Sequence, residues 1–177
     1  MTAATPPLAT ARLRLRALRV DDAEAMFPSL SDPDLMTWWS RPPFDTVAEV
    51  RDYFGPRPDM EGWRCWAITL AGDDQAIGWV ATGEKRQGGV SEIGYLLARA
   101  HWGSGIAREA VSAVITQIFA EGKRRIFADT DPENTASNAL LERLGFRREG
   151  LLRGEWETHI GIRDSVIWGL LATEWKD

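Results

Sequence analysis

The sequence predicts a single domain of the α/β class. Strand-like segments with period-two alternation and helix-like segments with three- and four-residue apolar spacing follow one another along 177 residues. With 44% hydrophobic composition, the chain can enclose one substantial core but is short for two domains. It contains neither internal repeats nor low-complexity linkers. We therefore expect residues 1–177 to form one domain, with residues 1–9 as a loose N-terminal tail.

The N-terminal half predicts one strand, two short helices and a β-hairpin. Basic and apolar side chains alternate in TARLRLR, as in a half-buried strand. Asp21 and Asp22 suit the start of a helix, whereas three prolines interrupt the segment 33–43. The Gly-Asp-Asp sequence at 72–74 predicts the turn of the hairpin. In chain order, the expected elements are a strand at 12–16, helices at 21–30 and 46–54, and strands at 63–70 and 76–82.

The C-terminal half predicts a strand-helix-strand unit, then a helix and two more strands. Apolar residues recur at three- and four-residue steps from Ala107 to Phe119, which indicates an amphipathic helix ending near Gly122. A helix that joins two strands in this way is typical of a crossover, so we expect a parallel or mixed sheet. The expected elements are strands at 91–98 and 126–130 around that helix, a second helix at 135–144, and strands at 148–157 and 165–171.

Composition narrows the classes of function. The 21 basic and 26 acidic side chains give a formal charge of -5, which opposes nucleic-acid binding and favours the approach of a cationic amine. No apolar run approaches the roughly 20 residues that span a bilayer, and the first residues lack the order of a secretory signal. The single cysteine, Cys65, cannot form an intramolecular disulfide. We therefore expect a cytoplasmic protein with no nucleic-acid or membrane partner. His101 and His159 lack metal-ligand spacing, so we expect no metal.

Two glycines mark the point where a strand has ended and a helix begins. Gly103 and Gly105 bracket Ser104, and backbone N–H groups there lie unpaired at the positive end of the helix, where they can hold a pyrophosphate. An ordinary tight turn with positive φ explains the same glycines. A Rossmann fingerprint requires a third glycine where Arg108 stands, and no Walker loop is present. Glycine spacing alone therefore leaves a phosphate site and an ordinary turn open.

Two longer runs carry a family resemblance. EIGYLLARAHWGSGIAREAV, followed by DTDPENTASNALLERLGFRREG, resembles the GNAT acetyltransferase superfamily and, within it, the RimJ/RimL-type branch. The TARLRLR opening and the late RDSVIW segment extend the resemblance over nearly the whole chain. It implies a mixed, largely antiparallel sheet of about six to seven strands, flanked by helices, with a parallel strand-helix-strand unit that binds the coenzyme. It also implies acetyl transfer from acetyl-CoA to a primary amine, either a protein N-terminus or a small molecule, by direct attack in a ternary complex.

The resemblance implies coenzyme contacts in three places. The pyrophosphate loop spans residues 102–108, the pantetheine arm lies between strands 91–98 and 126–130, and an Asn-x-x-Ser element opens the second helix. Trp102 stands where the superfamily commonly has Gln or Arg, a change that occurs in this branch. The implied coenzyme-binding residues are Leu96, Leu97, Trp102, Gly103, Ser104, Gly105, Ile106, Ala107, Arg108, Asn134 and Ser137.

The reaction needs a neutral amine, a donor for the developing oxyanion and an acid for the departing thiolate. By resemblance, the oxyanion donor is a backbone amide near Leu96 or Leu97. Many superfamily members place a tyrosine seven residues after the asparagine, but Leu141 occupies that position here. The resemblance to this branch implies Ser137 as the alternative proton donor, either directly or through water. The competing explanation is that Ser137 only caps the helix.

Two acidic residues are candidates for the general base. Glu92 alternates with Ile93 on its strand, so the two side chains lie on opposite faces of the sheet and Glu92 can face the cleft. Glu157 lies where related enzymes have acidic residues, and we rank it second. Each is also compatible with an ordinary surface carboxylate, and an amine that arrives neutral from water needs no base.

The acceptor and the activity itself remain open at this level. Trp38 and Trp39 are expected to line the acceptor entrance, because loops often edge a site and aromatic faces hold cations. A pocket closed by residues 38–54 would favour a small acceptor and an open groove a peptide, and a homodimer could reshape either. Leu141 in place of tyrosine also leaves open a catalytically inactive acyl-CoA-binding sensor or interaction protein on the same scaffold.

Overall fold

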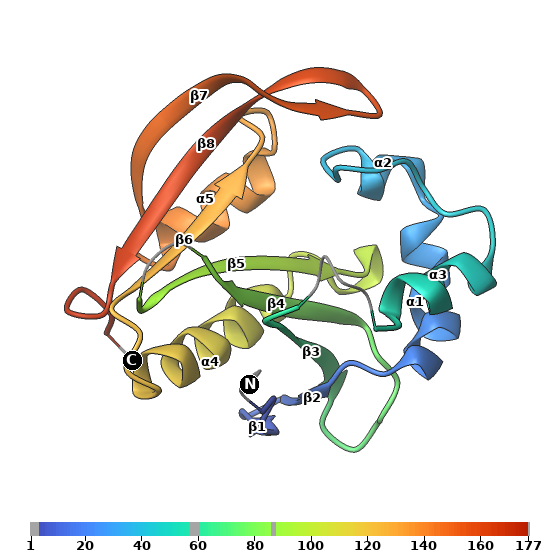
Figure 1. Ribbon diagram of the computed structural model, residues 1–177. Helices are drawn as coiled ribbons and strands as arrows, with labels where there is room; N and C mark the ends of the chain where they lie inside the picture. The colour runs from blue at the N-terminus through green and yellow to red at the C-terminus, as the bar shows by residue number, and fades with distance from the viewer. Residues whose placement is uncertain (1–3, 57–60, 86–87, 177) are drawn as a thin grey trace.

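The computed structural model describes residues 4–56, 61–85 and 88–176, and its strands form one eight-stranded sheet in the order β1-β2-β3-β4-β5-β6-β8-β7 (Figure 1). Neighbouring strands are antiparallel except β5 and β6, which are parallel. The predicted α/β class and mixed, largely antiparallel sheet are therefore confirmed. The strands are β1 (Leu8–Ala9), β2 (Leu13–Ala17), β3 (Trp63–Leu70), β4 (Gly78–Glu84), β5 (Val90–Leu97), β6 (Arg125–Thr130), β7 (Arg147–Thr158) and β8 (Gly161–Leu171).

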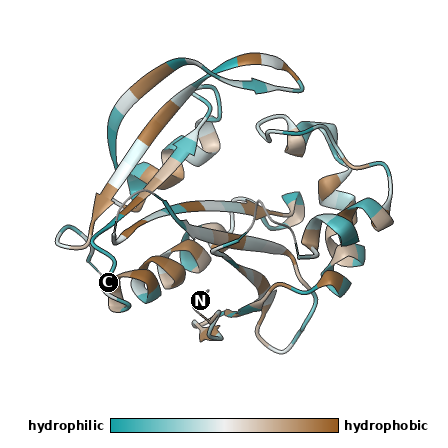
Figure 2. Ribbon diagram, in the orientation of Figure 1, coloured by the Kyte–Doolittle hydropathy of each residue, from teal (hydrophilic) through white to brown (hydrophobic). Residues whose placement is uncertain are grey.

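Helices cover both faces of the central strands. In the described residues they are α1 (Ala23–Leu30), α2 (Pro33–Met36), α3 (Val47–Phe54), α4 (Ile106–Ala120) and α5 (Thr135–Arg143), with 3₁₀ turns η1 (Val20–Asp22) and η3 (Arg99–His101). Along β4, Val80 belongs to the core layer under α4, while Trp79 and Ala81 belong to the layer under α1 and α3. This alternation follows from the period of two in a strand. Figure 2 shows that α4, which covers one face of the sheet, has both hydrophobic and hydrophilic residues along its length.

The expected loose tail is wrong for its described residues. Leu8 and Ala9 form β1 against β2, which brings the sheet to eight strands instead of six to seven. The buried Trp66 indole donates to the carbonyl of Pro6 over 2.8 Å, and the buried Arg64 guanidinium donates to the carbonyl of Ala4 over 2.9 Å. Buried donors need acceptors, and the tail supplies two of them. Residues 1–3 lie outside the described range.

The segment expected to be broken by proline contains a short helix. Asp32 caps α2 by accepting hydrogen bonds from the N–H groups of Asp34 and Leu35, and Pro33 occupies its first turn. Proline is favoured there because its missing N–H would have no intrahelical partner in any case. Pro33 therefore starts a helix instead of interrupting one.

The sheet parts between its two parallel strands. β5 pairs with β6 only from Val90 to Glu92, although β5 stays paired with β4 as far as Leu97. On the other side, β6 stays paired with β8 as far as Thr130. The C-terminal part of β5 consequently has one edge without a partner strand. This open edge faces a cleft between the two halves of the sheet.

Candidate active site

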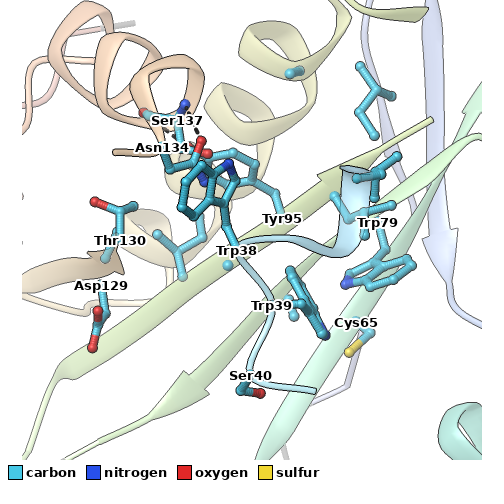
Figure 3. Close-up of a pocket in the computed structure, with 18 of the residues that line it drawn as sticks. Trp38, Trp39, Ser40, Cys65, Trp79, Tyr95, Asp129, Thr130, Asn134 and Ser137 are labelled. Carbon is cyan, nitrogen blue, oxygen red and sulfur yellow. Dashed lines mark hydrogen bonds between the residues drawn. The ribbon is translucent and has the colours of Figure 1, made fainter. Parts of the chain in front are cut away.

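A cleft of about 2360 Å³ opens where β5 and β6 part. Its walls come from the ends of these strands, the first turns of α4 and α5, the loop after α2 and the tip of the β7–β8 hairpin. Figure 3 shows the side chains that β6, α5 and the loop after α2 contribute. It brings together most of the residues expected from the sequence, namely Trp38, Trp39, Glu92, Leu96, Leu97, Trp102, Gly103, Gly105, Ala107, Arg108, Asn134 and Ser137. Ser104, Ile106 and Glu157 are not among the described residues that line it.

The glycine turn has a conformation that favours glycine. Gly103 and Gly105 have φ of 70° and 80°, and Gly105 is the N-cap of α4. A Cβ at Gly103 would meet no other atom within 4 Å, and one at Gly105 would meet only Arg12 Nη2 at 3.5 Å. Backbone conformation, and not crowding, therefore accounts for these glycines within the protein. The amides of the first turn of α4 lack intrahelical partners, so this end of the helix can receive an anion.

A charged cluster from the start of the chain holds this turn in place. Arg12 Nη1 donates to the Ser104 carbonyl over 2.9 Å, and Arg12 Nε donates to Glu109 Oε2 over 2.7 Å. Thr10 Oγ1 also donates to Glu109. Partial burial by itself would raise the pKa of Glu109. The hydrogen bonds from Thr10 and Arg12 outweigh it and lower that pKa below its usual value. Arg12 was not among the predicted site residues, because it lies more than 90 residues before the turn and meets it only in the folded protein.

Trp102 is fixed by its indole. Trp102 Nε1 donates to the carbonyl of Leu97 over 2.7 Å, and the Arg99 guanidinium lies 5.2 Å from the centroid of the indole ring. The side chain is nevertheless 49% exposed and borders the cleft. Trp102 thus ties the glycine turn to the end of β5, which positions the turn without supplying a charge.

The backbone N–H groups of Leu96 and Leu97 point to opposite sides of β5. The carbonyl of Gly89 accepts hydrogen bonds from the chain that leads into β6, whereas the N–H of Ala98 donates toward β4. Backbone groups alternate in direction along a strand, and the register with β4 is unbroken over this range. The N–H of Leu97 therefore points into the gap, and that of Leu96 points toward β4. Of the two candidates for an oxyanion donor, only Leu97 has a suitable direction.

Asn134 and Ser137 meet at the start of α5 in the cleft. Asn134 is the N-cap, and its side-chain oxygen accepts from the Ser137 N–H over 3.2 Å. The Tyr95 hydroxyl donates to the Ser137 carbonyl over 3.4 Å. Asn134 therefore performs the capping, and the Ser137 hydroxyl is left for another role (Figure 3). Leu141 is fully buried in the core, away from this turn of the helix.

Tyr95 lies close to the expected proton donor. Burial raises the pKa of Tyr95 to about 12, and its hydrogen bond to Ser137 opposes this only in part. The phenol therefore remains protonated at neutral pH. Its proton is directed at a carbonyl of α5, so Tyr95 ties the strand to the helix across the opening of the sheet.

The two candidate bases lie in different places. Glu92 lines the cleft, with Lys85 Nζ 3.7 Å from its carboxylate. Glu157 is exposed on β7 and pairs with Ile162, whereas its neighbour Trp156 borders the cleft. An irregularity in the β7–β8 register precedes Trp156, and alternation then turns Glu157 away. The expected placement of Glu157 at the site is therefore wrong.

Asp129 is a cleft carboxylate that sequence analysis missed. It lies near the end of β6 and accepts hydrogen bonds from the Ser165 hydroxyl and from Trp156 Nε1, the latter over 3.0 Å. Figure 3 shows it on the wall formed by β6. The signal was an acidic residue toward the carboxyl end of an apolar strand, at the edge where α/β proteins often bind ligands.

The two tryptophans after α2 lie at the cleft, as expected. The guanidinium of Arg163 lies 5.7 Å from the Trp38 ring centroid, and Asp131 holds that arginine over 2.7 Å. Trp39 packs edge-on against Trp79 with ring centroids 5.8 Å apart. The loop after α2 therefore meets the β7–β8 hairpin beside Trp38, while Trp39 lies deeper.

Within the described residues, no group of three or more potential ligands is arranged to hold a metal.

A sheet that parts between two parallel strands, beside a helix that begins in a glycine turn, defines an acyltransferase of the class expected from the sequence. Comparison with known proteins makes the assignment specific. The chain belongs to the GNAT acetyltransferase family, because the model described as an acetyltransferase (GNAT) domain matches residues 12–147. It is accordingly an N-acetyltransferase, as predicted.

Individual relatives agree with this assignment. The uncharacterized N-acetyltransferase p20 of Bacillus licheniformis is 35% identical over 173 residues, covering 95% of this chain and 97% of that protein. A GNAT-family acetyltransferase from Bacillus anthracis has a crystal structure that superposes with a TM-score of 0.85 at 26% identity, covering 96% of this chain and all of that one.

The RimJ/RimL-like branch is supported by a further relative. The [ribosomal protein uS5]-alanine N-acetyltransferase of Escherichia coli is 33% identical over 90 residues, covering 47% of this chain and 43% of that enzyme. The match covers less than half of this chain, and it supports the branch. In the described residues, no helix combines the length and the apolarity needed to cross a membrane.

Proposed function

We propose that this enzyme transfers an acetyl group from acetyl-CoA to a primary amine by direct attack in a ternary complex. The observation that carries the proposal is the open edge of β5, which leads from the last pair with β6 to the glycine turn of α4. An extended pantetheine arm can add to such an edge as a strand does, while its pyrophosphate lies at the helix terminus.

The chain offers a group for each part of the coenzyme. The first-turn amides from Gly105 to Arg108 would hold the pyrophosphate, with Trp102 and Arg12 keeping the turn in position. Asn134 would contact the arm from the opposite wall, because it lines the cleft at the start of α5. Since these groups are largely backbone amides, they suit any acyl-CoA and do not by themselves select the acetyl group.

In the proposed reaction, the neutral amine attacks the thioester carbonyl. A C–N bond forms, the C–S bond breaks, and the Leu97 N–H donates to the oxyanion that develops between these steps. The proton lost by the amine passes to Glu92 or to water. Ser137 donates its hydroxyl proton to the departing thiolate and recovers a proton from solvent.

Two acceptor classes fit this reaction, a protein N-terminus and a small-molecule amine. Partial similarity to an enzyme that is named for the alanine of a ribosomal protein favours the first. The aromatic lining of the cleft by Trp38 and Trp39 favours the second. We further propose that the protein acts in the cytoplasm without a metal and without nucleic acid, and that a homodimer is compatible with the site.

Thiol release from acetyl-CoA tests the proposal. It should be measured with a panel of amines and peptides, alongside coenzyme binding by calorimetry. We expect both binding and amine-dependent release. Binding without release for every acceptor would favour the alternative, an inactive acyl-CoA-binding sensor on the same scaffold, and a chain that binds no coenzyme would contradict both.

A further inference from the structure

Three small residues form a row across three neighbouring strands on the cleft side of the sheet. Cys65 on β3 is directly opposite Ala81 on β4, and Ala81 is directly opposite Gly94 on β5. All three line the cleft. A Cβ added to Gly94 would meet no atom within 4 Å, so the space above this end of the row is open. We call this row the trough.

Aromatic side chains stand on both sides of the trough. On one side is Trp79, which packs edge-on against Trp39 and against Phe54, with ring centroids 5.8 and 5.6 Å away. On the other side, Trp63 lies so closely over Gly83 that a Cβ there would be 2.5 Å from its indole. Trp79 and Gly83 are four residues apart on β4, which separates the two sides by about 14 Å at the backbone. The trough is therefore wide enough for a flat apolar group between the rings.

One end of the trough opens into the gap of the sheet, the same gap in which the proposed function places the thioester. Gly94 lies just beyond Glu92, the last residue of β5 that pairs with β6, so the trough opens at the parted edge of the sheet. Glu92 lies on the same face as Gly94 in the next row. A flat acceptor body that lies over Gly94 and Ala81 between the tryptophans would therefore extend its amine along β5 toward the thioester at Leu97, about 10 Å from Gly94.

We propose that the acceptor is a small primary amine with a flat apolar body, of the arylalkylamine type. This inference rests on the proposed function, because it assumes that the thioester lies in the gap of the sheet. A polyamine would place a second charge in the apolar trough, and a peptide would place backbone polar groups there, both of which cost free energy without partners. An aryl ring instead meets other rings edge-on, in the arrangement that Trp39 and Trp79 already adopt.

A comparison of acceptors tests the chemistry. With acetyl-CoA, 2-phenylethylamine should show a kcat/KM at least about tenfold above those of ethylamine, spermidine and an alanine-led peptide. If spermidine or the peptide proves the best acceptor, the inference is overturned while the proposed function stands. If no coenzyme binds and no amine releases thiol, the proposed function fails as well.

A substitution in the trough tests the location. Gly94→Val places two methyl groups in open space at a regular strand position, so the variant should fold and should bind acetyl-CoA as the wild type does. Its KM for 2-phenylethylamine should rise at least about tenfold, with little change for ethylamine. Gly150→Val is the matched control, since Gly150 also lies in a strand with open space above it but does not line the cleft.

Two results would overturn the assignment of the trough to the acceptor. If Gly94→Val weakens acetyl-CoA binding and lowers activity equally on every amine, then Gly94 serves the coenzyme. If the variant leaves 2-phenylethylamine unaffected but loses transfer from phenylacetyl-CoA to ethylamine, then the trough holds the acyl group. Circular dichroism and melting temperature, compared with the Gly150→Val control, establish that both variants are folded.

Discussion

The coenzyme side and the acceptor side of the cleft are built from different parts of the chain. The coenzyme side consists mainly of backbone groups at the ends of regular elements, from the open edge at Leu97 to the first turn of α4 after Gly105. The acceptor side consists of side chains that converge from β3, β4, β5 and the loop after α2. A site made of backbone keeps its ligand as long as the fold is kept. A site made of side chains can change its ligand through single substitutions.

Ser137→Ala should give the largest effect on this comparison, because it removes the one side chain that we assign to chemistry on the coenzyme side. We expect kcat to fall about a hundredfold with unchanged acetyl-CoA affinity, since Asn134 and not Ser137 caps α5. Thiol release and calorimetry measure the two quantities. Thr135→Ala, which removes an exposed hydroxyl from the same turn, is the control. Unchanged turnover in Ser137→Ala would leave the serine with a structural role only.

Gly105→Val should act on binding instead of turnover. The φ of 80° at Gly105 costs a side-chain-bearing residue about 1–2 kcal/mol, and the coenzyme must restore that conformation when it binds. We therefore expect the Kd for acetyl-CoA to rise about five- to thirtyfold. Ser104→Ala should leave the Kd unchanged, because the hydrogen bond that Ser104 accepts from Arg12 uses its backbone carbonyl. Equal affinities for Gly105→Val and wild type would refute the position of the pyrophosphate.

The two regions also differ in how far the sequence could predict them. The glycine turn and the Asn-x-x-Ser element are local, so their residues were identified before the fold was known. The trough could not be predicted, because Cys65, Ala81 and Gly94 become neighbours only through the register of three strands. Glu157 was misplaced for a similar reason, since the irregularity before Trp156 changes which side chains of β7 face the cleft.

The elements of the fold that local sequence patterns determine were predicted. The elements that depend on contacts between distant parts of the chain were missed. Strands and helices lie within a few residues of the expected positions because their apolar periodicity is strong. β1 was missed, since Leu8 and Ala9 carry no periodic pattern. They are held by pairing with β2, and the neighbouring Pro6 carbonyl accepts a hydrogen bond from the buried Trp66 indole. Asp129 was missed as well, because its place in the cleft depends on where β6 leaves β5.

Glu92→Gln should affect the acceptor side of the cleft and not the coenzyme side, with a smaller change than Ser137→Ala. We expect kcat/KM for the amine to fall about tenfold, because the cleft carboxylate that is proposed to accept the proton of the amine loses its charge. The KM for acetyl-CoA should not change. Glu157→Gln, which alters an exposed carboxylate outside the cleft, should match the wild type. Equal losses in the two variants would indicate a general charge effect instead of a specific role for Glu92.

Glu109→Gln should give the smallest effect, and it concerns the charged side chains that hold the glycine turn. Hydrogen bonds from Thr10 and Arg12 keep the pKa of Glu109 below its usual value in the folded protein, against the effect of partial burial. A carboxyl whose pKa is lowered by folding stabilises the protein at pH values above its unfolded pKa. That contribution is lost as the pH falls through the folded pKa.

We therefore expect the glutamine variant to melt about 3 °C lower at pH 7, the effect of roughly 1 kcal/mol, as measured by thermal unfolding. Below pH 4.5, the usual pKa of the carboxyl, the two melting temperatures should converge. Glu142→Gln, an exposed carboxylate on α5, provides the control. A constant difference between wild type and Glu109→Gln down to pH 3 would mean that the loss comes from packing, and the glycine turn would then owe its position to the backbone alone.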